Sequence, residues 1–530
     1  MERRREREKQ LRILRYASPP PMVAAVTARR LAGDWRGACA AALVDAHIDL
    51  RDVASRYGAD EAARIESELR GFAPDLLRRF LPRTSSLALV PTARVVLSRL
   101  AEPVRTRPGP RRRGTPLLVA TLPATDRRPQ RVALRVTDSL DLPNAWYDLP
   151  DWCWHADAVA ARRWAYGASD DRLAWHTADG RPHRQGESTP TGSPADRAGE
   201  VETVAALLAA GRTIAAYEAV GWTVDAAGGA HWYTGWPTVE QVLGWHVAAL
   251  PVLAAEARRL ARRYGATTLH LANSPLAVDV ADGGALTVRA AAPGSPRGGP
   301  NVFGTPAPMD VALLRRGMLT PDELHPLVHE ALFPGRTQAW RVPQPAPPPP
   351  FRVRCGPDWH LVRVADNRIE TPHHTDEELR REFLLAGLGG PIGGCAAAVR
   401  AWRTGMKPVP KEIRKIRRDL FGRAFHGDTE GLLSLIFDGM DPGLRDGVGG
   451  TLMHRLAFVD HTQMLPILTA AGLCVDEPDR DGNTPLHAAA AAAATEVMAA
   501  LVDAGADPDA VNREGRTAAE VLAAARRTGG

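Results

Sequence analysis

A step of 33 residues organises the last fifth of this 530-residue chain. A fixed period with matching residue types indicates stacked copies of one supersecondary unit, because such a unit buries its apolar face only against its neighbours. We therefore expect an array of repeats at the C-terminus. The residues that recur at this step are Thr451, Thr484 and Thr517; Gly439, Gly472 and Gly505; Gly449, Gly482 and Gly515; and Ala424, Ala457 and Ala490.

The copy at 484–516 indicates a pair of helices. Thr484 can cap the first helix, Pro485 suits its first position, and Gly505 suits the left-handed end of the second. Together with Leu486 and His487, these residues resemble the ankyrin repeat, whose period is also 33. The resemblance covers about 418–527, in units at 418–450, 451–483 and 484–516 with a C-terminal cap at 517–527.

The resemblance implies an all-α solenoid that binds a protein partner through its loop tips and inner helical face. It also implies that His454 and His487 bond to the backbone between repeats. Leu452 departs from the family pattern, which has proline there, and a helix at 411–421 suits an N-terminal cap. The residues expected to build the repeats are Thr451, His454, Gly472, Thr484, Pro485, Leu486, His487 and Gly505.

Charged residues in the expected loops are the candidate partner contacts. The alternative is that they are ordinary solvated loop charges, since few residues of an interface carry its binding energy. The candidates are Asp446, Asp479, Arg480, Asp481, Arg513 and Glu514.

Composition bounds the compartment and the partners. The formal charge of +6 is modest for this length and argues only weakly for a polyanion partner. Five scattered cysteines without a CxxC pair suit reduced thiols in the cytosol better than a disulfide framework or a zinc knuckle. No signal peptide and no apolar stretch of 18 residues is evident, so a cytoplasmic location is expected. The excess of arginine over lysine, with much alanine, favours a bacterial source.

The remaining sequence predicts an α+β body. We expect a charged tail at 1–21, the body at 22–340, a Pro-rich linker at 341–350, a small connector at 351–410 and the repeats at 411–530. The helices expected in the body are one that opens at 33–35 and runs to Val44, three at 60–70, 74–80 and 238–264, and one that opens at Thr320 and ends before Pro334. Strands are expected at 87–90, 116–119 and 131–136, and a hairpin at 276–288.

Two groups of residues in the body are candidates for chemistry. His325 and His329 are four apart on an expected helix, as zinc ligands often are, but no third ligand is evident and surface histidines explain the pattern equally well. Cys153 and His155 would share a face of a strand, although a lone Cys/His pair specifies little and a buried tryptophan-rich core is the alternative.

Arginines near tryptophans could stack on a ligand or on nucleic acid bases. Arg162, Arg163 and Arg172 lie near Trp164 and Trp175, but such tryptophans more often belong to a core. A nucleic-acid surface would require the arginines of 105–113 and 411–423 to form one face, and we consider nucleic acid an unlikely partner.

These patterns favour a protein–protein interaction or scaffold protein that recruits a partner through its C-terminal repeats. The alternative is an enzyme or effector whose α+β body carries an unidentified activity while the repeats select the target. No P-loop, dinucleotide-binding fingerprint, nucleophile elbow or kinase motif is present. We therefore assign no catalytic residue, cofactor or metal, and expect no membrane partner. The motifs leave enzymatic activity open and favour a protein without it.

Overall fold

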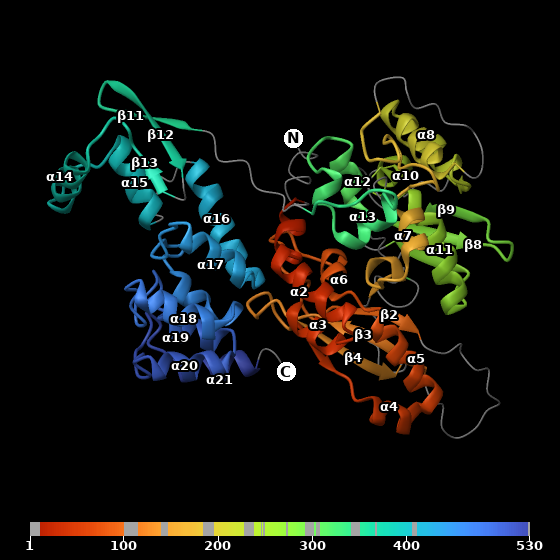
Figure 1. Cartoon of the computed structure of the whole chain (residues 1–530), viewed down its shortest axis with the longest axis horizontal. Helices are drawn as coiled ribbons and strands as arrows, with labels where there is room; N and C mark the ends of the chain where they lie inside the picture. Colours follow the sequence, from red (N-terminus) through yellow and green to blue (C-terminus); the bar gives the residue numbers. More distant parts are fainter. Residues whose placement is uncertain are drawn as a thin grey trace.

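Two parts of the molecule lie side by side in the computed structural model (Figure 1). One is a body of mixed helices and strands, and the other is a column of helices that ends at the C-terminus. The residues described are 11–99, 115–138, 147–183, 196–226, 238–244, 246, 250–271, 274–291, 302–303, 308–340, 350–365, 368–404 and 411–527.

The first half of the body is built around a five-stranded mixed sheet with the order β1-β4-β3-β2-β5. Its central strand β3 is buried from Pro116 to Ala120, which explains its continuous apolar sequence. Its elements are α2 (Pro20–Leu31), α3 (Trp35–Ala41), β1 (Val44–His47), α4 (Leu50–Tyr57), α5 (Ala59–Arg70), α6 (Pro74–Phe80), β2 (Arg94–Arg99), β3 (Pro116–Thr121), β4 (Val132–Asp138), β5 (Tyr147–Asp148), η2 (Asp151–Cys153) and α7 (Val159–Ala165).

The second half of the body contains another five-stranded sheet with the order β10-β7-β8-β9-β6 and a separate apolar core. Its elements are α8 (Arg197–Ala209), α9 (Thr213–Glu218), β6 (Trp222–Val224), α10 (Val239–Leu243), α11 (Leu250–Tyr264), β7 (Thr268–Leu271), β8 (Leu276–Val280), β9 (Leu286–Ala290), β10 (Val302–Phe303), α12 (Met309–Leu314), η3 (Pro321–Glu323) and α13 (Pro326–Leu332).

The two sheets share one topology. In each, taken in chain order, the first strand pairs parallel with the fourth, the second, third and fourth form an antiparallel meander, and the fifth pairs parallel with the second. In each, a pair of helices precedes the first strand, α2 and α3 in one and α8 and α9 in the other. The body is therefore built from two units of the same topology.

Buried polar links join the two units. The Asp148 carboxylate at β5 accepts a hydrogen bond from Arg263 of α11 at 3.0 Å and another from Tyr264. His325 at the start of α13 contacts Asp75 of α6, with 2.9 Å between Nε2 and Oδ2. Because α12 and α13 also contribute to the core of the first unit, the two units pack as one body.

A small connector of three strands and two helices follows the body. Its antiparallel sheet has the order β11-β12-β13, and its second helix packs against the end of the column (Figure 1). The elements are β11 (Phe351–Cys355), β12 (Asp358–Ala365), β13 (Arg368–Glu370), α14 (Asp376–Gly387) and α15 (Gly394–Thr404).

The column consists of stacked helix pairs that share one continuous core. Gly472 and Gly505 have φ values of 84° and 96° just after α18 and α20, so these glycines supply the left-handed turns that end the two helices. The elements are α16 (Lys411–His426), α17 (Thr429–Phe437), η4 (Leu452–Phe458), α18 (His461–Ala470), α19 (Pro485–Ala491), α20 (Thr495–Asp503) and α21 (Ala518–Arg527).

The α+β body and the helical C-terminal part agree with the expected fold class, but four expected elements were wrong. The helix expected from residue 33 to Val44 ends at Ala41, because Leu43 adopts a φ of 56° and Val44 begins β1. The helix expected to run unbroken from Thr320 is divided, since Pro326 disfavours helical geometry in His325. The strand expected at 87–90 forms only an isolated bridge between Leu89 and Arg83.

The long helix expected at 238–264 is also divided, into α10 and α11, with Gly244 as the C-cap of α10. Helices at 59–70 and 74–80 and the hairpin of β8 and β9 agree with the sequence-based expectations. Among the described residues, no helix combines the length and the apolar character that crossing a bilayer requires.

Candidate functional site

Two histidines connect successive repeats of the column. His454 Nε2 lies 3.0 Å from the carbonyl oxygen of Asn483, and His487 Nε2 lies 2.9 Å from that of Arg516. The Nδ1 atom of each histidine accepts the backbone N–H of the threonine three residues before it. In this arrangement Nδ1 accepts and Nε2 donates, so each ring bonds to the backbone of its own repeat and to that of the next one. Burial lowers the pKa of His454.

An aspartate or asparagine side chain shapes each loop between helix pairs, and these residues also recur every 33 positions. One side-chain oxygen of Asp446, Asp479 or Asn512 accepts backbone N–H groups two and four residues later, at 2.8–3.1 Å. Asp446 also pairs with Arg455. The carboxylates of Asp446 and Asp479, both candidate partner contacts, therefore hold their own loops in shape.

The other four candidate contacts lie on the same row of loops. Arg480 N donates to the carbonyl of Val448 at 2.9 Å, and Arg513 N donates to that of Asp481 at 3.0 Å, so each loop is bonded to the next. Arg516 pairs with Glu514. These backbone bonds fix the positions of the loops and leave the side chains of Asp481, Arg513 and Glu514 exposed at the edge of the column.

The column docks on the body through a partly buried carboxylate on α16. Asp419 accepts hydrogen bonds from Arg15, at 2.6 Å, and from the Tyr16 hydroxyl, and its second oxygen accepts from Arg423 at 3.2 Å. The Tyr16 ring stacks on His426, with centroids 5.5 Å apart. Burial raises the pKa of Asp419, but Arg15 and Arg423 outweigh that effect and hold it below its ordinary value.

A cleft of about 1010 Å³ lies beside this contact, between the N-terminal segment of the body and the first repeats. Tyr16 and Leu87 of the body face Phe421 and Phe425 of α16 across it, so part of its wall is apolar. Asp446 is the one carboxylate among its lining residues. Six arginines line it: Arg12, Arg414, Arg417, Arg418, Arg455 and Arg480.

The charge of the cleft is strongly positive. Arg414 and Arg418 are exposed on consecutive turns of α16, while the buried Arg417 donates to the carbonyl of Ala401 at 2.8 Å. His426 contributes no charge, because burial and the nearby Arg83 and Arg78 lower its pKa well below the ordinary value. Fixed positive charges beside aromatic side chains suit an anionic ligand that also carries apolar groups.

The two histidines considered as zinc ligands serve the core of the body. His325 precedes α13, and its Nε2 contacts Asp75. His329 lies within α13 against Phe333, with ring centroids 5.8 Å apart. Burial lowers the pKa of both rings. Their expected place on one exposed helix face was therefore wrong, because His325 is a helix cap directed at α6.

The expected strand carrying Cys153 and His155 was also wrong, since Cys153 ends the 3-10 helix η2 and His155 forms only an isolated bridge with Phe72. Cys153 is fully buried, and burial raises the pKa of its thiol well above the ordinary value, which opposes formation of a nucleophilic thiolate. His155 Nε2 lies 4.0 Å from Glu68 and its Nδ1 accepts the N–H of Asp157. These contacts favour the tryptophan-rich core interpretation.

Guanidinium groups do lie over Trp164 and Trp175, but they belong to other arginines than the three near them in sequence. Arg197 lies over the exposed Trp164 ring at 4.0 Å, and Arg315 lies over Trp175 at 3.9 Å. Arg172 instead pairs with Glu202 at 2.7 Å. The arginines of 105–113, proposed as half of a nucleic-acid surface, lie outside the described residues.

Sequence reasoning missed a group of Cys and His side chains in the connector. Cys355, His360, His374 and Cys395 bring together four possible ligand atoms, all within 4.8 Å of one another. Their spacing follows no common CxxC pattern, which is why the cysteines were interpreted as isolated thiols. The signal that was available is the concentration of Cys and His in this short segment.

Comparison with known proteins identifies one family. The family model for ankyrin repeats, in three copies, matches residues 420–512. None of the curated proteins matches the chain. The match covers the column from the end of α16 to the end of α20, with the two histidines that connect its repeats, so this C-terminal part of the chain is an ankyrin-repeat array.

Proposed function

We propose that this protein binds an acidic segment of a partner protein in the arginine-lined cleft between its ankyrin array and its α+β body. The single observation that carries the proposal is the lining of the cleft, which holds six arginines and one carboxylate beside aromatic side chains. Arginine pairs well with carboxylates because its planar guanidinium offers several donors in a fixed geometry.

A protein partner fits this site better than a nucleic acid. Ankyrin repeats are generally protein–protein interaction modules. The volume of the cleft is at the upper end for small-molecule sites, which suits a short peptide segment. A duplex would need a wide basic face with phosphate contacts along it. In this proposal Arg480 contributes to the cleft, and the exposed loop charges Asp481, Arg513 and Glu514 extend the contact beyond it.

The proposal gives the two parts of the chain separate tasks. The array, at 411–530, recognises the partner. The body, at 22–340, supplies the opposite wall of the cleft together with Arg12 and Tyr16 of the preceding segment, and is brought to that partner. The chain would then act as a scaffold. The scattered cysteines are consistent with a reducing compartment such as the cytoplasm.

The test measures binding of a fluorescent acidic peptide that contains one aromatic residue, by fluorescence anisotropy with the full-length protein. Charge reversal of two exposed cleft residues, in an Arg414→Glu/Arg418→Glu variant, should weaken binding about tenfold or more, because two attractions become repulsions. The matched control is Arg380→Glu/Arg381→Glu, which makes the same change of charge on the exposed face of α14. It should bind as the unmodified protein does.

Two results would contradict the proposal. Equal loss of affinity in both variants would show that total charge matters and the cleft does not. Tighter binding of a single-stranded oligonucleotide than of the peptide, again lost in the cleft variant, would assign the cleft to nucleic acid. Raising the salt concentration should weaken peptide binding in the unmodified protein, since exposed charges are screened.

A further inference from the structure

The connector places a thiol and an imidazole on one face of a hairpin. Cys355, the last residue of β11, pairs with Asp358 of β12 across the two-residue turn at 356–357. Residues two apart in a strand share a face, so His360 lies on the same face as Asp358 and hence as Cys355. The hairpin alone therefore supplies two possible ligands.

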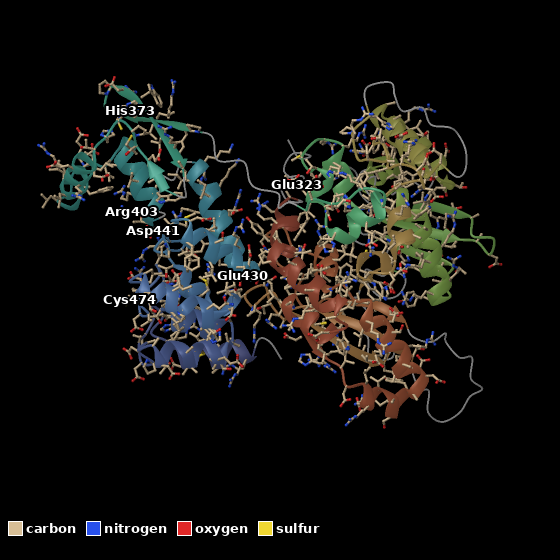
Figure 2. All side chains as sticks on the ribbon, viewed as in Figure 1. Glu323, His373, Arg403, Glu430, Asp441 and Cys474 are labelled. Carbon is tan, nitrogen blue, oxygen red and sulfur yellow. The ribbon has the colours of Figure 1, made fainter. Side chains whose placement is uncertain are left out.

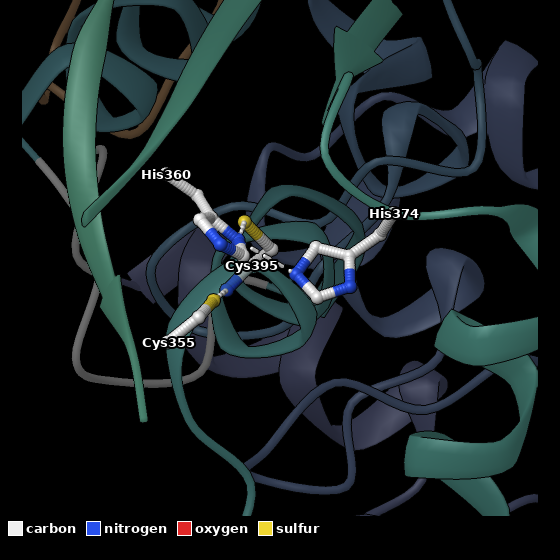
Figure 3. A group of neighbouring side chains, drawn as sticks. All are labelled: Cys355, His360, His374 and Cys395. Carbon is white, nitrogen blue, oxygen red and sulfur yellow. Dashed lines mark hydrogen bonds between the residues drawn. The ribbon is translucent and has the colours of Figure 1, made fainter. Parts of the chain in front are cut away.

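Two further side chains reach this face from the helices of the connector. His374 lies just before α14, and Cys395 lies in the first turn of α15. His360 Nδ1 is 2.9 Å from His374 Nε2 and 3.9 Å from Cys395 Sγ. Figure 3 shows the four side chains converging on one point from three elements of the fold.

These distances match a tetrahedral zinc site. Zinc binds cysteine sulfur at about 2.3 Å and histidine nitrogen at about 2.0–2.1 Å, so the ligand atoms of a Cys₂His₂ site lie roughly 3.3–3.8 Å apart. The two distances in the cluster bracket that range, and no pair of ligand atoms exceeds 4.8 Å. Two thiolates with two imidazoles select zinc over magnesium or calcium, which prefer oxygen ligands.

The surroundings of the cluster support the ligands. The backbone N–H of Cys395 donates to Cys355 Sγ at 3.0 Å, a bond that favours a thiolate. A Cβ atom at the preceding Gly394 would lie 2.1 Å from that sulfur, so only glycine permits this approach. The Glu378 carboxylate is 3.8 Å from His374 Nδ1, on the side of the ring opposite the cluster. A carboxylate there orients a metal-binding histidine.

The connector has little else to hold it together. Its own apolar cluster contains only five buried residues among those described, and one of them is Cys395. Small units with so little core usually need a disulfide or a structural metal. The other face of α15 places Ala398 and Trp402 in the core of the ankyrin array. A metal bound to Cys395 would therefore link the hairpin to the end of the array.

We propose that Cys355, His360, His374 and Cys395 bind one structural Zn²⁺ ion, which fixes the connector as the N-terminal cap of the ankyrin array. With four protein ligands the coordination shell is closed, so the site has no open position for catalysis. Binding replaces the protons of the two thiols, and two protons are released for each ion bound.

The first test measures zinc in the purified full-length protein by mass spectrometry of the metal. We expect one zinc ion per chain, and a loss of nearly all of it in a Cys355→Ser/Cys395→Ser variant. The matched control is Cys474→Ser, because Cys474 is exposed at the edge of the array that faces away from the body (Figure 2). This control should keep the full zinc content.

A second variant tests the site without removing a ligand. Glu378→Gln keeps the side-chain acceptor that caps α14 at Thr375 but removes the charge beside His374. Loss of such an outer partner typically weakens metal affinity about 10–100-fold. We expect a loss of this size in competition with a zinc chelator, with an unchanged helix content by circular dichroism.

Cobalt provides a readout on the unmodified chain if a variant fails to fold. Protein stripped of metal under reducing conditions should bind one Co²⁺ ion and develop the intense visible absorption of a tetrahedral thiolate site. Zinc should displace it. Protein that contains no zinc and binds neither metal when reduced would overturn the proposal. A disulfide between Cys355 and Cys395 in freshly purified protein that persists without metal binding after reduction would overturn it as well.

Discussion

Replacement of Asp419 by alanine should separate the ankyrin array from the body. This carboxylate accepts hydrogen bonds from Arg15 and Tyr16 of the body and from Arg423 of its own helix. Without it, Arg15 and the Tyr16 hydroxyl lose their common acceptor at the contact. Arg423 keeps an ion pair with Asp428 at 2.7 Å, so α16 itself should remain folded.

The size of the effect follows from the burial of the contact. A hydrogen bond to a charged group contributes about 1.5–3 kcal/mol, and Asp419 makes two to the body. Its side chain is 23% exposed and that of Arg15 is 16% exposed, so water replaces part of the lost interaction. We expect a loss of about 2–4 kcal/mol in docking free energy, which is roughly 30- to 1000-fold in the docking equilibrium.

Hydrogen–deuterium exchange detects this separation directly. In the variant, exchange should accelerate in residues 11–17 and in the face of α16 that contacts them, and remain unchanged in α18–α20. The matched control is Asp503→Ala, which removes an exposed helical carboxylate from α20. Unchanged exchange at 11–17 in the Asp419 variant, or equal acceleration in the control, would refute the docking role of this residue.

Three further predictions concern the repeats and the buried histidines of the chain. His487→Ala should destabilise the array by about 3–4 kcal/mol, because it empties a buried site and leaves the Arg516 carbonyl without its donor. His461→Ala on α18, the control, should lower the stability only slightly. Urea unfolding measures both variants. Gly505→Ala should lower the free energy of unfolding by about 1–2 kcal/mol, because an added Cβ meets nothing within 4 Å and only the φ of 96° is strained. Gly447→Ala, the control, should leave it unchanged; thermal melting measures both. Because burial lowers the pKa of His325, His426 and His454 in the folded state, the unfolded chain binds more protons below about pH 6.5. The melting temperature should therefore fall as the pH is lowered from 7.5 to 5.5, and a constant or rising value would contradict these assignments.

The array was predictable because its period specifies both the local structure and its neighbours. Thr484, Pro485 and His487 set the start of a helix and the bond to the next repeat, and Gly505 sets the end. The same logic failed for the loop charges. The sequence shows that Asp446 and Asp479 are polar and lie in loops, but only the structure shows that their carboxylates accept the N–H groups of those loops.

The body was less predictable because its order depends on contacts distant in sequence. Its two units share a strand order, yet no residue pattern at a fixed step connects them. Leu43 ends a helix through its backbone conformation, which apolar periodicity cannot indicate. The sequence near His325 suggests a surface position, because its partner Asp75 lies 250 residues earlier in the chain.

The two candidate sites were missed for the same reason. The cleft needs Arg12 and Tyr16 from one end of the chain and seven residues of α16 from the other. The connector cluster needs a hairpin turn to place Cys355 beside His360 and a helix start to bring Cys395 to them. Spacing along the sequence indicates metal or ligand sites only when the elements between the residues are short and regular.

Photo-crosslinking from the cleft tests the central claim most directly. A benzophenone amino acid in place of Phe421, which lines the cleft on α16, would be irradiated in cells that produce the full-length protein, and the crosslinked peptides sequenced. The account predicts crosslinks to an acidic segment of a second protein that disappear when Arg414 and Arg418 are replaced by glutamate. Crosslinks that persist in that variant, that join nucleic acid, or that form only within the chain would contradict it.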